Sequence, residues 1–122
     1  MLDVAATIDA LVERPSETVL LADYDGSLSP IVDRPDHAVP LPAAIDVFVA
    51  GFSVASYAGD DTGDLAAFAA LARGQADGRL ARAVRIGVRS PEMPPALPDS
   101  VDCLVDGPDG LVDLLAGVAR AL

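Results

Sequence analysis

Short apolar runs alternate along this chain with segments of helical periodicity, and this alternation limits the folds that the chain can adopt. The runs are 18–23 "TVLLAD", 53–58 "SVASYA", 83–88 "AVRIGV" and 101–105 "VDCLV". Runs of this length and composition suit strands that are covered on both faces, as in a parallel sheet. Helical periodicity predicts helices over 2–13, from about Asp64, and over the last twelve or so residues. The sequence therefore predicts a small α/β domain with a mostly parallel sheet of about four strands.

Two segments between these elements are less regular. Residues 24–42 are rich in proline, which predicts a loop. Residues 43–50, "AAIDVFVA", fit either a helix or a strand. The 122 residues are enough for one hydrophobic core, so we expect a single domain over 1–122.

Composition excludes several classes of function. The formal net charge of -11 argues against nucleic acid and against an anionic membrane surface as partners. A single cysteine, Cys103, cannot form an internal disulfide, and the first fifteen residues resemble neither a signal peptide nor a membrane span. The cytoplasm is therefore the expected location. All eight basic residues are arginines, so any mechanism that needs a lysine is excluded.

Acidic residues follow the first two predicted strands. Asp23 and Asp25 come at the end of the first strand, and Asp60, Asp61 and Asp64 follow the second. A single aspartate in a loop is usually a turn or helix-cap residue. Two acidic clusters at neighbouring strand ends would repel each other unless a cation lay between them. Carboxylate oxygens suit Mg²⁺, which binds one or two carboxylates, waters and a substrate phosphate.

Two other loop types fail on spacing or composition. An EF-hand loop that began at Asp23 would need its glycine at position six, whereas Gly26 is at position four. A phosphate-binding P-loop needs a Gly-Lys pair, which a chain without lysine cannot supply.

Two motifs resemble those of a known superfamily. "LLADYDGSLSPIV" resembles the first motif of the haloacid dehalogenase superfamily of phosphatases, and "YAGDDTGDLAAF" resembles its fourth. The flanking segments "LSPIVDRPDHAVPLP" and "IGVRSPEMPPALPDSVDCLVDGPDGLVDLLAGVARAL" look like those of trehalose-6-phosphate phosphatases. The resemblance covers 1–42 and 53–122, and it implies a three-layer, Rossmann-like haloacid dehalogenase core.

The resemblance implies a Mg²⁺-dependent hydrolysis of phosphomonoesters, with trehalose 6-phosphate as the family's substrate. Asp23 would be the nucleophile that forms an aspartyl-phosphate, and Asp25 would be the general acid and base. Gly26 would permit the tight turn of the loop. Ser27 would donate a hydrogen bond within that loop.

The same resemblance implies a set of metal ligands. The carboxylates of Asp23 and Asp60 and the backbone carbonyl of Asp25 would hold Mg²⁺. Asp61 and Asp64 would bind it directly or through water. Asp64 has a competing role as an acidic residue in the first turn of a helix, where the helix dipole favours it.

Parts of the family pattern are missing. The lysine that fixes the phosphate is absent, and only residues 43–52 stand where relatives carry a sugar-binding cap domain and further strands. We therefore expect no cap domain, impaired activity and little preference for trehalose 6-phosphate. A non-catalytic remnant or interaction module is the alternative. A response-regulator receiver ranks last, because its chemistry needs a lysine.

The shortened middle also has a consequence for the sheet. In the family, the first strand is flanked on both sides, so its outer side would here be an open edge. Either residues 43–52 form a strand that fills this edge, or another chain covers it and the protein forms a homodimer.

Overall fold

Four parallel strands form one sheet in the computed structural model, which describes residues 1–23 and 42–122. In order across the sheet these strands are β1 (Thr18–Ala22), β2 (Val54–Gly59), β3 (Arg82–Val88) and β4 (Cys103–Val105). All three pairs of neighbours are parallel. The predicted α/β class and mostly parallel sheet are confirmed, and the arrangement is compatible with a Rossmann-like fold.

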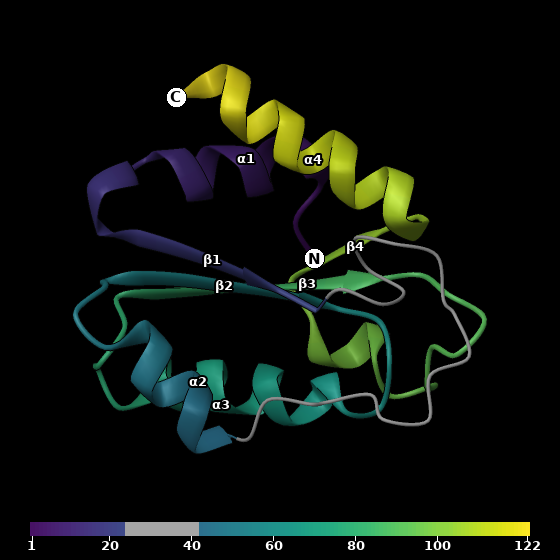
Figure 1. The fold of residues 1–122 in the computed structure, drawn as a ribbon, viewed down its shortest axis with the longest axis horizontal. Helices are drawn as coiled ribbons and strands as arrows, with labels where there is room; N and C mark the ends of the chain where they lie inside the picture. Colours follow the sequence, from purple (N-terminus) through teal and green to yellow (C-terminus); the bar gives the residue numbers. More distant parts are fainter. Residues whose placement is uncertain (24–41) are drawn as a thin grey trace.

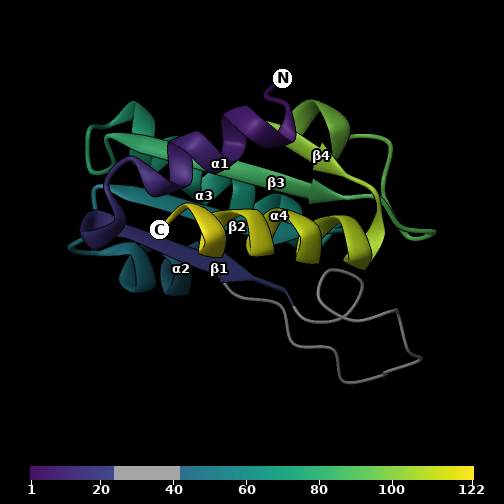
Figure 2. The same cartoon turned by 90° about the horizontal axis from the view of Figure 1, so that it is seen from above.

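Helices cover both faces of the sheet and make a three-layer arrangement (Figure 1). One layer holds α1 (Val4–Val12) and α4 (Gly107–Ala121), which lie side by side above the strands (Figure 2). The other holds α2 (Pro42–Val49) and α3 (Asp64–Ala76). Two short 3₁₀ turns, η1 (Pro15–Glu17) and η2 (Pro98–Ser100), precede β1 and β4.

Each face of the sheet has its own apolar core. Tyr57, Phe68 and Leu71 belong to the core on the side of α2 and α3. Leu11 and Leu114 belong to the core on the side of α1 and α4. Since β2 contributes to both cores, every residue of this strand is buried, which explains its continuous apolar sequence.

Residues 43–50, which fitted either a helix or a strand, are helical. Ile45 and Val49, one helical turn apart, are buried in the core of α2 and α3. Val47 and Phe48, which lie between them, are exposed. A strand would have placed Ile45, Val47 and Val49 on one face, so the burial pattern follows the helical period instead. The loop predicted over 24–42 falls almost entirely on residues 24–41, which lie outside the described residues.

No helix in the described part of the chain is long and apolar enough to cross a membrane.

Within the described ranges, β1 is an edge strand that pairs with β2 alone. The segment 42–49, which could have formed a further strand beside β1, instead packs as α2 against α3. Leu20, in the middle of β1, keeps 41% of its surface exposed. Leu20 also lines a cavity of about 270 Å³, whose other walls are mostly apolar residues of the first three strands, α1 and α4. The expectation that residues 43–52 form a strand at this edge is therefore wrong, because this segment is helical, and association with another chain stays a prediction.

We expect two copies of the chain to pair antiparallel through β1. A two-fold axis at Leu20 sets the exposed Leu20 of one copy against that of the other. The same axis sets Glu17 against Asp23, and these like charges oppose association at low ionic strength. Light scattering should therefore show a dimer that strengthens with protein and salt concentration. Leu20→Lys should remain monomeric, because it places two charges at the centre of the pairing. A monodisperse wild-type monomer at high concentration and high salt would contradict the pairing.

Candidate metal centre

Parallel pairing brings the ends of β1 and β2 together at one edge of the sheet. Ala22, the last residue of β1, is in register with Ala58. The backbone N–H of Asp23 then donates to the carbonyl of Ala58 at 2.9 Å. Asp60 follows directly after β2. The two aspartates therefore leave neighbouring strands at the same level, where ligands of parallel sheets bind.

Four carboxylates converge at this edge: those of Asp23, Asp60, Asp61 and Asp64. One oxygen of each lies within 4.8 Å of the chosen oxygens of the other three. All but Asp61 are buried. Two unit charges at this distance repel by roughly 3 kcal/mol at an effective dielectric constant of about 20. A cluster of this kind needs protons or a cation to lower the repulsion.

Asp60 is the buried carboxylate of this cluster whose charge the described residues compensate least. Its side chain is 1% exposed, and neither carboxylate oxygen has a hydrogen-bond partner among the described residues. Burial is the main cause that raises the pKa of Asp60 from 3.8 to about 6, and the charges of Asp61 and Asp23 add to it. The Ser90 side chain lowers this pKa, but its contact with Asp60 does not have the geometry of a hydrogen bond. A buried carboxylate with unused lone pairs is suited to bind a cation.

Asp64 differs from Asp60 because its oxygens already accept hydrogen bonds. Oδ1 accepts from the Tyr57 hydroxyl at 2.7 Å, and Oδ2 accepts from the backbone N–H groups of Asp60 at 2.8 Å and Asp61 at 3.2 Å. Burial is the main cause that raises the pKa of Asp64 to about 7, while the bond from Tyr57 lowers it. Burial, followed by the charge of Asp64, raises the pKa of Tyr57 above its ordinary value, so this hydroxyl stays protonated and donates its hydrogen bond to Asp64.

The start of α3 closes the loop that carries these residues. The backbone N–H of Asp64 lies 3.1 Å from the carbonyl of Asp61 and 3.3 Å from its Oδ1. Gly59 lies so close to Asp64 that a Cβ on this glycine would overlap the Asp64 carboxyl group. The segment 59–64 thus forms a turn, and the Asp64 side chain stabilises it by accepting hydrogen bonds from the backbone of this turn.

The sequence predictions for this site fall into three groups. The structure brings together Asp23, Asp60, Asp61 and Asp64, as predicted. The predicted site residues Asp25, Gly26 and Ser27 lie outside the described residues. Asp64 lies in the first turn of α3, as one of its two predicted roles requires, and it also belongs to the cluster that could hold a metal. Its hydrogen bonds add a third role, because they hold the turn that precedes α3.

Tyr57 is a residue of this region that the sequence analysis treated only as part of a strand. Its ring packs edge-on against Phe68, with ring centroids 5.7 Å apart, and its hydroxyl reaches Asp64. A tyrosine on a fully buried strand needs a partner for its hydroxyl. Because Tyr57 stands two residues before the Gly-Asp-Asp motif, the sequence could have indicated an aspartate of this motif or of the following helix as the partner of its hydroxyl.

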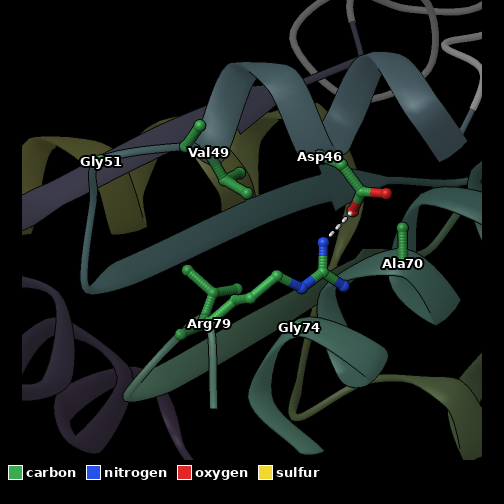
Figure 3. A pocket seen from close by; sticks show the side chains of 8 residues that line it. Asp46, Val49, Gly51, Ala70, Gly74 and Arg79 are labelled. Atoms are coloured by element: carbon green, nitrogen blue, oxygen red, sulfur yellow. Dashed lines mark ion pairs between the residues drawn. The ribbon is translucent and has the colours of Figure 1, made fainter. Parts of the chain in front are cut away.

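A separate cavity of about 290 Å³ lies near the amino ends of β2 and β3 (Figure 3). Arg79 reaches across it from the segment after α3 to Asp46 of α2, at 3.2 Å (Figure 3). The same guanidinium also contacts Asp77 at 2.9 Å. Because two carboxylates already balance Arg79, this cavity offers no unbalanced cation to an anionic ligand.

Comparison with protein-family models, with curated proteins and with solved structures finds no match to this chain.

Proposed function

We propose that this chain is a Mg²⁺-dependent phosphomonoester hydrolase of the trehalose-6-phosphate phosphatase type, built on a small haloacid dehalogenase core without a cap. The observation that carries the proposal is the convergence of four carboxylates from two neighbouring strand ends. It agrees with the two motifs that resemble the superfamily. The substrate would be a small phosphorylated sugar or another phosphomonoester.

The reaction would proceed through an aspartyl-phosphate. A carboxylate oxygen of Asp23 would attack phosphorus as the bond to the leaving alcohol breaks, and Asp25 would protonate the leaving oxygen. Asp25 would then take a proton from water as the water oxygen attacks phosphorus, which releases phosphate and restores Asp23. This order leaves both carboxyl groups as they began.

The carboxylates of Asp23, Asp60 and Asp61 would hold Mg²⁺, together with the backbone carbonyl of Asp25. Asp60 supports this assignment most directly, because its buried oxygens have no hydrogen-bond partner among the described residues. The ion would offset the negative charge that the phosphate brings to an already acidic pocket. Asp64 would contribute mainly through the turn that it holds.

The absence of lysine favours a second candidate function, a non-catalytic cation-binding or interaction module of the same family. Two arginines on or just after β3 are already paired, Arg85 with Asp102 at 3.0 Å and Arg89 with Asp106 at 2.7 Å. Beryllium fluoride, which mimics a phosphoryl group on a carboxylate, separates the two candidates. A catalytic domain should bind it at Asp23 in the presence of Mg²⁺, and a non-catalytic module should not.

Mg²⁺ should stabilise the wild-type protein against thermal unfolding. At a concentration about 100 times the dissociation constant, binding to the folded state adds about 2.7 kcal/mol to the free energy of unfolding. Asp60→Asn should lose most of this gain, because an amide brings no negative charge to the ion. Asp113→Asn, which removes the same charge from an exposed position on α4, should respond as the wild type does. Equal responses of wild type and Asp60→Asn in differential scanning calorimetry would overturn the site.

The pH dependence gives this experiment an internal control. Folding raises the pKa of Asp60 from 3.8 to about 6 and that of Asp64 from 3.8 to about 7. The folded protein therefore binds more protons than the unfolded chain between these values, so the stability of the metal-free protein falls as pH rises from about 4 to 7. Mg²⁺ competes with these protons, so its stabilising effect should be larger at pH 8 than at pH 5.

A further inference from the structure

We propose that Tyr57 is a positioning residue of the cation site, which it orders through Asp64 without contacting the ion. Its hydroxyl fixes the Asp64 carboxylate, and this carboxylate in turn holds the backbone from which Asp60 and Asp61 project. The inference rests on the proposed cation site and adds to it a residue outside the acidic cluster.

The Tyr57 hydroxyl is buried and has one hydrogen-bond partner among the described residues. Its side chain is 2% exposed and lies in the core between β2 and α3, where its ring meets the ring of Phe68. The phenolic O–H is directed at Oδ1 of Asp64, 2.7 Å away. Packing thus fixes the ring, and the fixed ring fixes one oxygen of the carboxylate.

The second oxygen of Asp64 fixes the backbone of the turn between β2 and α3. Oδ2 accepts from the N–H groups of Asp60 and Asp61, which are consecutive in the chain. Together with the bond from Tyr57, three of the roughly four lone-pair positions of this carboxylate are used within the protein. Asp64 therefore has little capacity left for a cation, and its main effect is on where its neighbours point.

Asp60 is the residue whose position depends most directly on Asp64. Its N–H is held by Asp64, while its own carboxylate has no hydrogen-bond partner among the described residues. The direction of the Asp60 side chain is thus set through its backbone and leaves both oxygens for an ion. Groups that orient metal ligands in this way change metal affinity by about 10- to 100-fold when they are removed.

Tyr57→Phe tests this role, because it removes one hydroxyl and keeps the aromatic ring. We expect Mg²⁺ to bind about 10-fold more weakly by isothermal titration calorimetry. We also expect faster hydrogen exchange at the amides of Asp60 and Asp61, measured by NMR without metal. Ser56→Ala is the matched control: it removes a buried hydroxyl from the adjacent position of β2, on the opposite face of the sheet. It should leave both quantities unchanged.

A double-mutant cycle shows whether Tyr57 acts through Asp64. In an Asp64→Asn background, Tyr57→Phe should change Mg²⁺ affinity by less than about twofold, because the path is already broken. A full additional loss in that background would overturn the proposal. Unchanged affinity and unchanged amide exchange in Tyr57→Phe alone would overturn it as well, while wild-type binding of Mg²⁺ would still support the proposed site.

Two further outcomes remain decisive. A wild-type protein that does not bind Mg²⁺ would overturn both this inference and the cation site, and the titration of the wild type alone shows that case. If Tyr57→Phe does not fold, amide exchange in Asp64→Asn takes its place. Fast exchange at Asp60 and Asp61 would support the path through Asp64, and protection equal to that of the wild type would overturn it.

Discussion

Asp23→Asn should abolish phosphomonoester hydrolysis and leave the fold in place. An amide cannot attack phosphorus as a carboxylate does, so no covalent intermediate can form. Loss of a covalent nucleophile lowers kcat on the order of a million-fold in other enzymes, which would place this variant at the background rate. The fold should survive, because the substitution removes one of four repelling carboxylates and keeps the backbone bond from residue 23 to Ala58.

Phosphate release from an aryl phosphate, with Mg²⁺ present, is the measurement. Asp113→Asn again serves as the matched control and should retain wild-type turnover. Turnover in Asp23→Asn equal to that of the wild type would show that the nucleophile is a different group. A wild type that binds Mg²⁺ but shows neither turnover nor beryllium fluoride binding would favour the non-catalytic alternative.

The same assay tests the expected loss of sugar recognition. Because we expect this chain to lack the sugar-binding cap of the family that it resembles, trehalose 6-phosphate should be hydrolysed only slightly better than a generic aryl phosphate. A strong preference for trehalose 6-phosphate would mean that this chain reads the sugar with residues of its own core.

The acidic cluster could be predicted from the sequence because it depends on short-range rules. Apolar runs locate the strands, and a residue that directly follows a strand lies at its carboxyl end. In a parallel sheet these ends share one edge, so Asp23 and Asp60 had to be close if their strands are neighbours. The prediction needed no side-chain geometry.

The contact between Tyr57 and Asp64 could not be predicted in the same way. The two residues lie seven positions apart, one inside a strand and one at the first turn of a helix. Whether they meet depends on how tightly the chain turns between them, and no sequence period encodes that. The sequence left the α2 segment open between helix and strand for a related reason. An apolar run of eight residues is too short for its period to separate helix from strand, and contact with α3 decides the outcome.

Gly59→Ala should cause one of the largest losses of stability that a single methyl group can produce in this chain. The added Cβ would overlap the Asp64 carboxyl group, so this carboxylate must move away from its position. That movement strains a buried core and breaks hydrogen bonds from Tyr57, Asp60 and Asp61. Overpacking and the loss of hydrogen bonds to a charged group each cost about 1–3 kcal/mol, so we expect the free energy of unfolding to fall by about 3 kcal/mol.

Gly110→Ala, in α4, separates this effect from the general cost of adding a methyl group. Its Cβ would lie 3.3 Å from the Cβ of Val105, a contact that small shifts can relieve, and alanine is the better helix former. Its unfolding free energy should therefore stay within about 1 kcal/mol of the wild-type value. Urea denaturation compares the two variants, and Mg²⁺ titration of the folded fraction should show weakened binding in Gly59→Ala alone. If Gly59→Ala proves as stable as Gly110→Ala and binds Mg²⁺ as the wild type does, then Asp64 does not hold the turn. In that case the acidic cluster must owe its geometry to the strand ends alone.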